Sequence, residues 1–191
     1  MVRHLPPVFA AVLASLMFWS AATLAQATPE TFAATATVKR AGTSVSAPFS
    51  VTITRYSSDA ERDAVMAAVR AGGSVALHRA LGSAKDAGFV QLGDRRTAIK
   101  FVGQRPMPSG RLVTIVTAEP ILYIGAGLPE APPRDGFDVA VAMLELEGGK
   151  VSGELVPAAK VGVDPKGALL IDDYGATVVW LTGVEKRNQA P

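Results

Sequence analysis

The sequence predicts an α+β fold, in which a mainly antiparallel sheet of about nine strands carries one helical hairpin between its second and third strands. Period-two alternation of apolar and polar residues recurs through most of the chain, as in strands with one buried face. Helix start and stop signals accompany a helical apolar stripe only in residues 58–82. Successive hairpins would form a curled sheet, a sandwich or a partial barrel, with the helices over one face or end.

The first 27 residues have the pattern of a cleaved export signal. Arg3 and His4 precede an apolar run over residues 8–19, and residues 25–27, Ala-Gln-Ala, match a signal cleavage site. The run is shorter than the roughly 18 apolar residues that a membrane-spanning helix needs, and no later segment is a better candidate. The chain has no cysteine to carry a lipid or a disulfide. We therefore expect a Sec-type signal and not a lipoprotein, and a periplasmic or secreted protein in which residues 28–191 form a single β-rich domain.

Charge argues against two classes of partner. The chain has 19 Lys and Arg residues against 17 Asp and Glu, with a formal net charge of +2. A nucleic-acid-binding protein concentrates positive charge to neutralise phosphates, and attraction to anionic lipids needs the same. We expect neither partner, and no transmembrane segment once the signal is removed.

The early part of the chain predicts two strands followed by the helices. Residues 32–38 and 49–53 alternate as half-buried strands, and residues 28–30 are expected to be a loose terminus. Ser58 and Glu61 match a capping box, in which each side chain satisfies a backbone N–H at the helix start. The pair Gly72-Gly73 is predicted to end a first helix, with a second one completing the hairpin at residues 58–82.

The later part predicts a series of hairpins. Residues 104–110 contain two prolines and are expected to form a long loop between strands. In residues 137–146 the apolar residues change parity after Met143, which predicts a bulge or a bend near that residue.

Two turns can be assigned from their chemistry. Gly148 and Gly149 lie between two predicted strands and are typical of a two-residue hairpin turn. Asp164, Pro165 and Gly167 occupy the first, second and fourth positions of a predicted type I turn.

Motifs for catalysis, metal or cofactor binding are weak. His78 is the only histidine after the signal, no G-x-S-x-G elbow is present, and there is no thiol. Asp172-Asp173-Tyr174 is the best carboxylate cluster, but it lacks a calcium-loop pattern, so we favour a turn over a cation or catalytic role. Residues 125–127, Gly-Ala-Gly, lack the third glycine of a nucleotide-binding motif. The sequence thus predicts no metal ligand, no cofactor and no assigned catalytic residue.

The junction between strand and first helix holds the candidate ligand residues. Arg55 lies within reach of Glu61, and a structural ion pair that orients the helix is the preferred interpretation. The alternative is a ligand or anion bound at the helix start by Arg55, Tyr56 and Glu61. A local basic excess near one predicted hairpin is interpreted as a solvated sheet edge rather than an anion site. It consists of Arg95, Arg96, Lys100, Arg105 and Arg111.

Three segments resemble a family of exported bacterial proteins with no assigned activity. They are residues 53–62 (ITRYSSDAER), residues 110–117 (GRLVTIVT), and residues 172–175 (DDYG) ahead of Val179-Trp180-Leu181. The resemblance extends from residue 32 to residue 184 and implies export, but no ligand or reaction. It would also imply an Asp-Arg pair after residue 117, where this chain has Ala118-Glu119.

Three functions remain open from the sequence. The leading hypothesis is an exported, non-catalytic binding or interaction domain whose partner is an unknown envelope protein. The alternative is a carrier of a small apolar ligand, since Ala, Val and Gly on strand faces could leave space in a barrel or between sheet and helices. An enzyme that uses Arg55, Tyr56 and nearby carboxylates ranks last.

Overall fold

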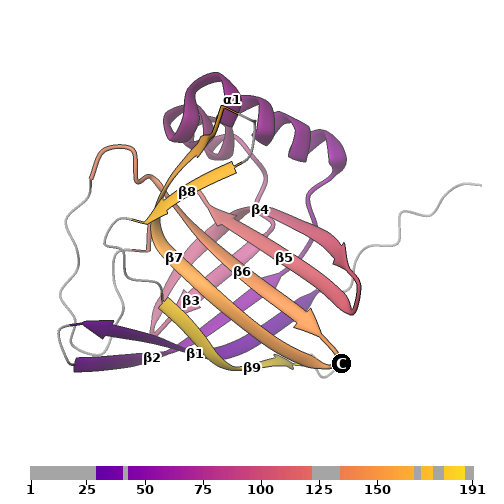
Figure 1. The fold of residues 1–191 in the computed structure, drawn as a ribbon, viewed down its shortest axis with the longest axis vertical. Helices are drawn as coiled ribbons and strands as arrows, with labels where there is room; N and C mark the ends of the chain where they lie inside the picture. Colours follow the sequence, from indigo (N-terminus) through magenta and orange to yellow (C-terminus); the bar gives the residue numbers. More distant parts are fainter. Residues whose placement is uncertain (1–28, 41–42, 122–133, 166–168, 174–178, 188–191) are drawn as a thin grey trace, which may run out of the picture.

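A computed structural model describes residues 29–40, 43–121, 134–165, 169–173 and 179–187 (Figure 1). Nine strands and one helix form in this part of the chain. In order they are β1 (Glu30–Arg40), β2 (Thr43–Ile53), α1 (Asp59–Gly82), β3 (Gly88–Leu92), β4 (Arg95–Met107), β5 (Gly110–Thr117), β6 (Val139–Glu147), β7 (Lys150–Val163), β8 (Leu169–Asp173) and β9 (Val179–Arg187). No helix in the described ranges is both long and apolar enough to cross a membrane.

The strands form one antiparallel sheet that closes into an eight-stranded barrel. The sheet order is β6-β5-β4-β3-β2-β1-β9-β7-β8, and an additional pairing of β6 with β7 closes the ring. β8 pairs with the far end of the long strand β7 and extends the sheet beyond the barrel. The predicted α+β class and mainly antiparallel sheet are confirmed, and among the closures left open the barrel is the one that forms.

Side chains fill the inside of the barrel. The inward positions of the strands carry apolar residues that form one continuous cluster. Its largest fully buried members include Phe32, Ile53, Leu92, Ile99, Ile115, Leu144 and Leu155. Barrels of about this size have interiors that side chains can fill, so this one is a packed core.

Helix α1 covers part of the outer surface, where it contacts β7 and β4 (Figure 1). Its residues Val69, Leu77 and Leu81 pack in a second cluster with residues such as Val141 and Val161. β6 is therefore apolar on both faces, one toward the barrel and one toward the helix. Of the bulge or bend predicted near Met143, the pairing of β6 with β5 shows no sign, whereas the pairing of β6 with β7 has a register shift between Val139 and Val141. The change of parity at Met143 itself reflects two buried faces.

The predicted two-helix hairpin is also wrong. A single helix forms, with a kink where Gly72 and Gly73 leave helical backbone angles. Gly73 has a φ of 57°, and a Cβ on it would lie 3.2 Å from the carbonyl oxygen of Val161 on β7. The hydroxyl of Ser74 accepts from the Val161 N–H (2.6 Å) and donates to its carbonyl (3.3 Å). The glycine pair thus lets the helix approach β7 closely instead of forming a loop between two helices.

The turns and loops predicted from the sequence are confirmed only in part. Gly148 and Gly149 both have positive φ and connect β6 to β7, as their sequence predicts. The long loop predicted over residues 104–110 is wrong, because β4 continues to Met107, which pairs with Gly110 across a tight turn. Asp164 and Pro165 follow β7, whereas Gly167 lies outside the described residues.

Candidate functional site

Arg55 is held in a structural cluster at the start of α1. Its guanidinium donates to Glu61 Oε2 (2.9 Å) and to the carbonyl oxygens of Lys85 (2.9 Å) and Asp86 (3.2 Å). Glu61 also accepts from the N–H of Ser58, whose hydroxyl accepts from the Glu61 N–H, so the predicted capping box is present. The hydrogen bond from Arg55, followed by that from Ser58, lowers the pKa of Glu61 to about 2. These contacts make Arg55 a link between the helix start and the segment that leads into β3.

Tyr56 turns away from Arg55 and joins a different set of charges. Its hydroxyl donates to Glu30 Oε2 (2.5 Å) and accepts from Arg111 (3.1 Å). Arg111 also donates to both carboxylate oxygens of Glu30 at 2.8 Å, and Lys186 donates to Glu30 Oε1 at 2.6 Å. We call Glu30, Tyr56, Arg111 and Lys186 the Glu30 network. It connects β1, the segment before α1, β5 and β9, so residue 30 is not the loose terminus that the sequence suggests.

Burial and pairing set the ionisation of this network. The Glu30 side chain is only 14% exposed, and burial alone would raise its pKa. Hydrogen bonds from Lys186, Tyr56 and Arg111 outweigh that burial and hold the pKa of Glu30 below its usual value. Burial, together with the neighbouring Glu30 carboxylate, raises the pKa of Tyr56 well above its ordinary value. At neutral pH the network therefore holds an ionised Glu30 and a protonated Tyr56.

A hollow of about 520 Å³ opens beside the Glu30 network. Tyr56, Arg111, Arg62 and Asp59 are among its lining residues, and Arg55 and Glu61 are not. Its cations already have partners, because Arg62 pairs with Asp59 at 2.9 Å and Arg111 pairs with Glu30. The charges of this hollow are thus compensated within the protein.

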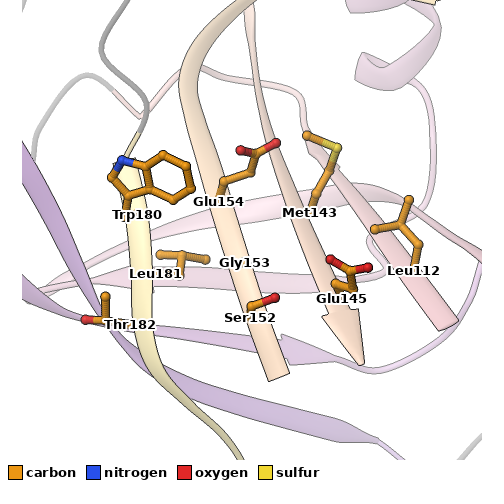
Figure 2. A pocket seen from close by; sticks show the side chains of 9 residues that line it. All are labelled: Leu112, Met143, Glu145, Ser152, Gly153, Glu154, Trp180, Leu181 and Thr182. Carbon is orange, nitrogen blue, oxygen red and sulfur yellow. The ribbon is translucent and has the colours of Figure 1, made fainter. Parts of the chain in front are cut away.

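A second hollow, of about 420 Å³, lies on the outer face of the barrel (Figure 2). We call it the Trp180 groove. Its side chains come from β5, β6, β7 and β9. They include Leu112, Met143, Glu145, Ser152, Glu154, Trp180 and Thr182.

Strand register explains how these residues meet. On β7, Glu154 lies opposite Met143 of β6 and opposite Trp180 of β9. Figure 2 shows the Glu154 side chain between those of Trp180 and Met143 on the barrel face. Glu145 on β6 lies opposite Leu112 of β5 and opposite Ser152 of β7, one row away. Glu145 and Glu154 are therefore diagonal neighbours, for which Cα separations of about 7–8 Å are usual.

Gly153 forms part of the groove floor. A Cβ at this position would lie 2.7 Å from Leu144 Cδ2 and 2.9 Å from the Met143 carbonyl oxygen. A larger residue would push β7 away from β6. Glycine here keeps the two strands that carry the glutamates in close pairing.

The Trp180 groove carries two acidic side chains, Glu145 and Glu154. Within the described ranges, neither Glu145 nor Glu154 forms an ion pair with a Lys or Arg. The Trp180 side chain is apolar for most of its area, yet the residue is 56% exposed. An exposed indole beside two uncompensated carboxylates can bind a cationic group through ring contact and ion pairing together.

The other residues singled out in the sequence do not assemble into a site. His78 is exposed on α1, and Asp172 is exposed on β8 opposite Lys160. No group of three or more His, Cys, Asp or Glu that could hold a metal is found in the described part of the chain. The side chain of Asp173, residue Tyr174 and residues 125–127 lie outside the described residues.

The basic residues near the β4–β5 hairpin also do not form one patch. Lys100 pairs with Asp86 at 2.7 Å, and Arg96 lies 4.5 Å from the ring centre of Phe89. Arg111 belongs to the Glu30 network. The sequence interpretation as a solvated edge therefore missed the partly buried role of Arg111.

Sequence reasoning missed the Trp180 groove entirely. Its residues come from four strands, and they meet only because the barrel closes with one particular register. The one local signal is that Trp180 has the opposite parity to the apolar residues Val179 and Leu181, which places a large indole on the outer face. Comparison with known proteins adds no further guide, since no family model, curated protein or solved structure matches the chain.

Proposed function

We propose that this protein is an exported, non-catalytic binding domain of the bacterial envelope that engages a partner protein through the Trp180 groove. The observation that carries the proposal is the exposed Trp180 side chain beside Glu145 and Glu154, two carboxylates that form no ion pair with the described residues. Tryptophan is enriched among the residues that dominate protein–protein binding energy. A barrel provides a rigid frame that holds such residues in place.

The packing of the barrel supports this proposal over a carrier of a small apolar ligand. A carrier of that kind needs a large internal cavity lined by apolar residues. Here the inward positions are occupied by large buried residues such as Phe32, Phe49 and Ile99. Both hollows described above open on the outside of the barrel and mix polar with apolar side chains.

The arrangement of the junction residues gives little support to an enzyme. A site built on Arg55 and Tyr56 would need both side chains and a carboxylate in one cleft. Arg55 instead contacts Glu61, whereas Tyr56 contacts Glu30 and Arg111. The two neighbours in sequence thus belong to two separate clusters.

Site-specific photo-crosslinking in the cells that produce the protein tests the proposed surface. A photo-reactive phenylalanine analogue at Ser152, which lines the groove and is exposed, should give adducts of a defined mass. The same analogue at Ser44, exposed on β2 outside the groove, is the matched control. Adding Trp180→Ala should abolish the Ser152 adducts. Equal adducts from both positions, or adducts that persist without Trp180, would refute the proposal.

Export is tested separately by fractionating the same cells. The chain should accumulate outside the cytoplasm with an intact mass that starts at Thr28, as the Ala-Gln-Ala cleavage pattern predicts. A full-length chain confined to the cytoplasm would contradict the exported part of the proposal.

A further inference from the structure

We infer that the partner inserts an arginine side chain, flanked by apolar residues, into the Trp180 groove. This inference rests on the proposed function and specifies the chemistry of the partner at the same surface. It follows from the charge of the groove, from the order of its side chains, and from its open shape.

The charge of the groove calls for a cation. Glu145 and Glu154 lie on neighbouring strands, face the same side of the barrel, and have no basic partner in the described part of the chain. Two carboxylates at diagonal positions place negative charge on the same face of the barrel, and a cation bound between them would be attracted to both. Glu30 provides the contrast, because this carboxylate stabilises the fold and is paired with both Arg111 and Lys186.

The order of the side chains favours arginine as that cation. Trp180 lies directly opposite Glu154, so a planar group can stack on the indole and meet a carboxylate at its edge. A guanidinium suits this arrangement because it is planar, stacks on aromatic rings and donates in pairs to carboxylates. A lysine ammonium would gain the charge interaction without the stacking and paired geometry.

The open shape and apolar flank favour a protein segment over a small molecule. The groove lies on the surface of the barrel, whereas sites for small ligands usually enclose most of the ligand. Met143 and Leu112 lie on the other side of Glu154 from Trp180, as Figure 2 shows. These residues would contact an apolar neighbour of the arginine, which fits a segment of alternating apolar and basic residues.

Tryptophan fluorescence provides a direct assay. The chain contains two tryptophans, Trp19 and Trp180, so Trp19→Phe in the full chain leaves Trp180 as the only tryptophan. The probe is the peptide acetyl-Leu-Arg-Leu-amide. Its control replaces arginine by citrulline, which has nearly the same shape but no charge. The arginine peptide should change Trp180 emission and bind at least about tenfold more tightly than the citrulline peptide. Its affinity should also fall as salt is added.

Matched variants connect that binding to the groove. Glu145→Gln combined with Glu154→Gln should weaken the arginine peptide roughly tenfold and leave the weak citrulline binding unchanged. Glu185→Gln makes the same chemical change on β9 at an exposed position outside the groove and should have no effect. Far-ultraviolet circular dichroism of each variant verifies that it is folded.

The outcomes separate this inference from the proposed function. Equal binding of the arginine and citrulline peptides would overturn the inference, as would equal binding of acetyl-Leu-Lys-Leu-amide or of tetramethylammonium. In each of these cases groove-specific adducts from Ser152 would leave the proposed function standing. Arginine-selective binding without such adducts would support the chemistry inferred for the groove and overturn the proposed function.

Discussion

The Glu30 network and the Trp180 groove contain similar residues, but they differ in whether the glutamates are paired with basic side chains. Each places glutamate beside an aromatic side chain, with one carboxylate in the network and two in the groove. In the network, Arg111 and Lys186 pair with Glu30, whose side chain is 14% exposed. In the groove, Glu145 and Glu154 have no such partner in the described ranges, and Trp180 is 56% exposed.

This difference indicates which cluster stabilises the fold and which is available to a ligand. A partly buried carboxylate needs its cations, because without them it would lose hydration and gain nothing in return. In the groove, Glu145 is exposed and Glu154 is half-buried, and both border an open hollow where water can hydrate them without an internal cation. We therefore expect substitutions in the network to reduce stability, and substitutions in the groove to reduce binding.

Removing Arg111, one of the two cations of the network, should give the largest loss of stability. Arg111→Met would take two hydrogen bonds from Glu30 and one from Tyr56. We expect the free energy of unfolding to fall by about 2–3 kcal/mol, because Glu30 would stay partly buried with Lys186 as its remaining cation. Urea denaturation measures this loss.

The neighbouring Arg105 provides the control. It is exposed on β4, and Arg105→Met should change the free energy of unfolding by less than about 0.5 kcal/mol. Equal losses for the two variants would show that Arg111 acts only as surface charge.

Acidification should weaken the network through Glu30. Its pKa in the folded protein lies below its usual value, so its stabilising effect is complete above the unfolded pKa of about 4.3 and is lost as the pH falls through the folded pKa. Glu61, with a pKa lowered to about 2, acts in the same direction and adds its own loss between about pH 4 and pH 2. Urea midpoints measured from pH 6 to pH 3 should therefore decrease. They should decrease less steeply in Glu30→Gln; an identical slope would contradict the assignment.

The cluster at the start of α1 provides a third case in which the charges are compensated. Ser58→Ala removes the hydroxyl that accepts from the Glu61 N–H. The free energy of unfolding should fall by about 0.5–2 kcal/mol, the usual cost of losing such a cap. Ser44→Ala, at an exposed strand position, serves as the control for the loss of a hydroxyl. An unchanged melting temperature in Ser58→Ala would show that the capping contact adds nothing.

Truncating the indole in the groove should have a smaller effect on stability. Trp180→Ala should lower the free energy of unfolding by less than about 1 kcal/mol, because the residue is 56% exposed. The same substitution should abolish the Ser152 adducts. A loss of stability comparable to that of Arg111→Met would mean that Trp180 is a structural residue.

The sequence predicts local features of this molecule better than contacts between distant strands. The capping box at Ser58 and the turn at Gly148-Gly149 depend on neighbouring residues, and both are present. The parity change at Met143 marks a strand that is buried on both faces, and the hairpin expected at Gly72-Gly73 is wrong, because docking of the helix on the barrel decides the structure at both places. Tertiary contacts override local patterns in this way when a strand is buried on both faces.

The two charged clusters were beyond the reach of sequence analysis for the same reason. Glu30 and Arg111 are 81 residues apart and meet only when β1 and β5 belong to one barrel. Glu154 and Trp180 meet through the pairing of β7 with β9 in that barrel. Alternation within a strand predicts which side a residue faces but not which strand lies beside it.

The most direct test of the comparison measures two properties in two matched variants, Glu30→Gln and Glu154→Gln. Each removes one negative charge and keeps the size of the side chain. Glu30→Gln should lower the free energy of unfolding by about 1–2 kcal/mol and leave the affinity for acetyl-Leu-Arg-Leu-amide unchanged. Glu154→Gln should change stability by less than about 0.5 kcal/mol and weaken that affinity several-fold. If Glu154→Gln destabilises the protein as much as Glu30→Gln does, or leaves the affinity intact, the division between a stabilising network and a binding groove is wrong.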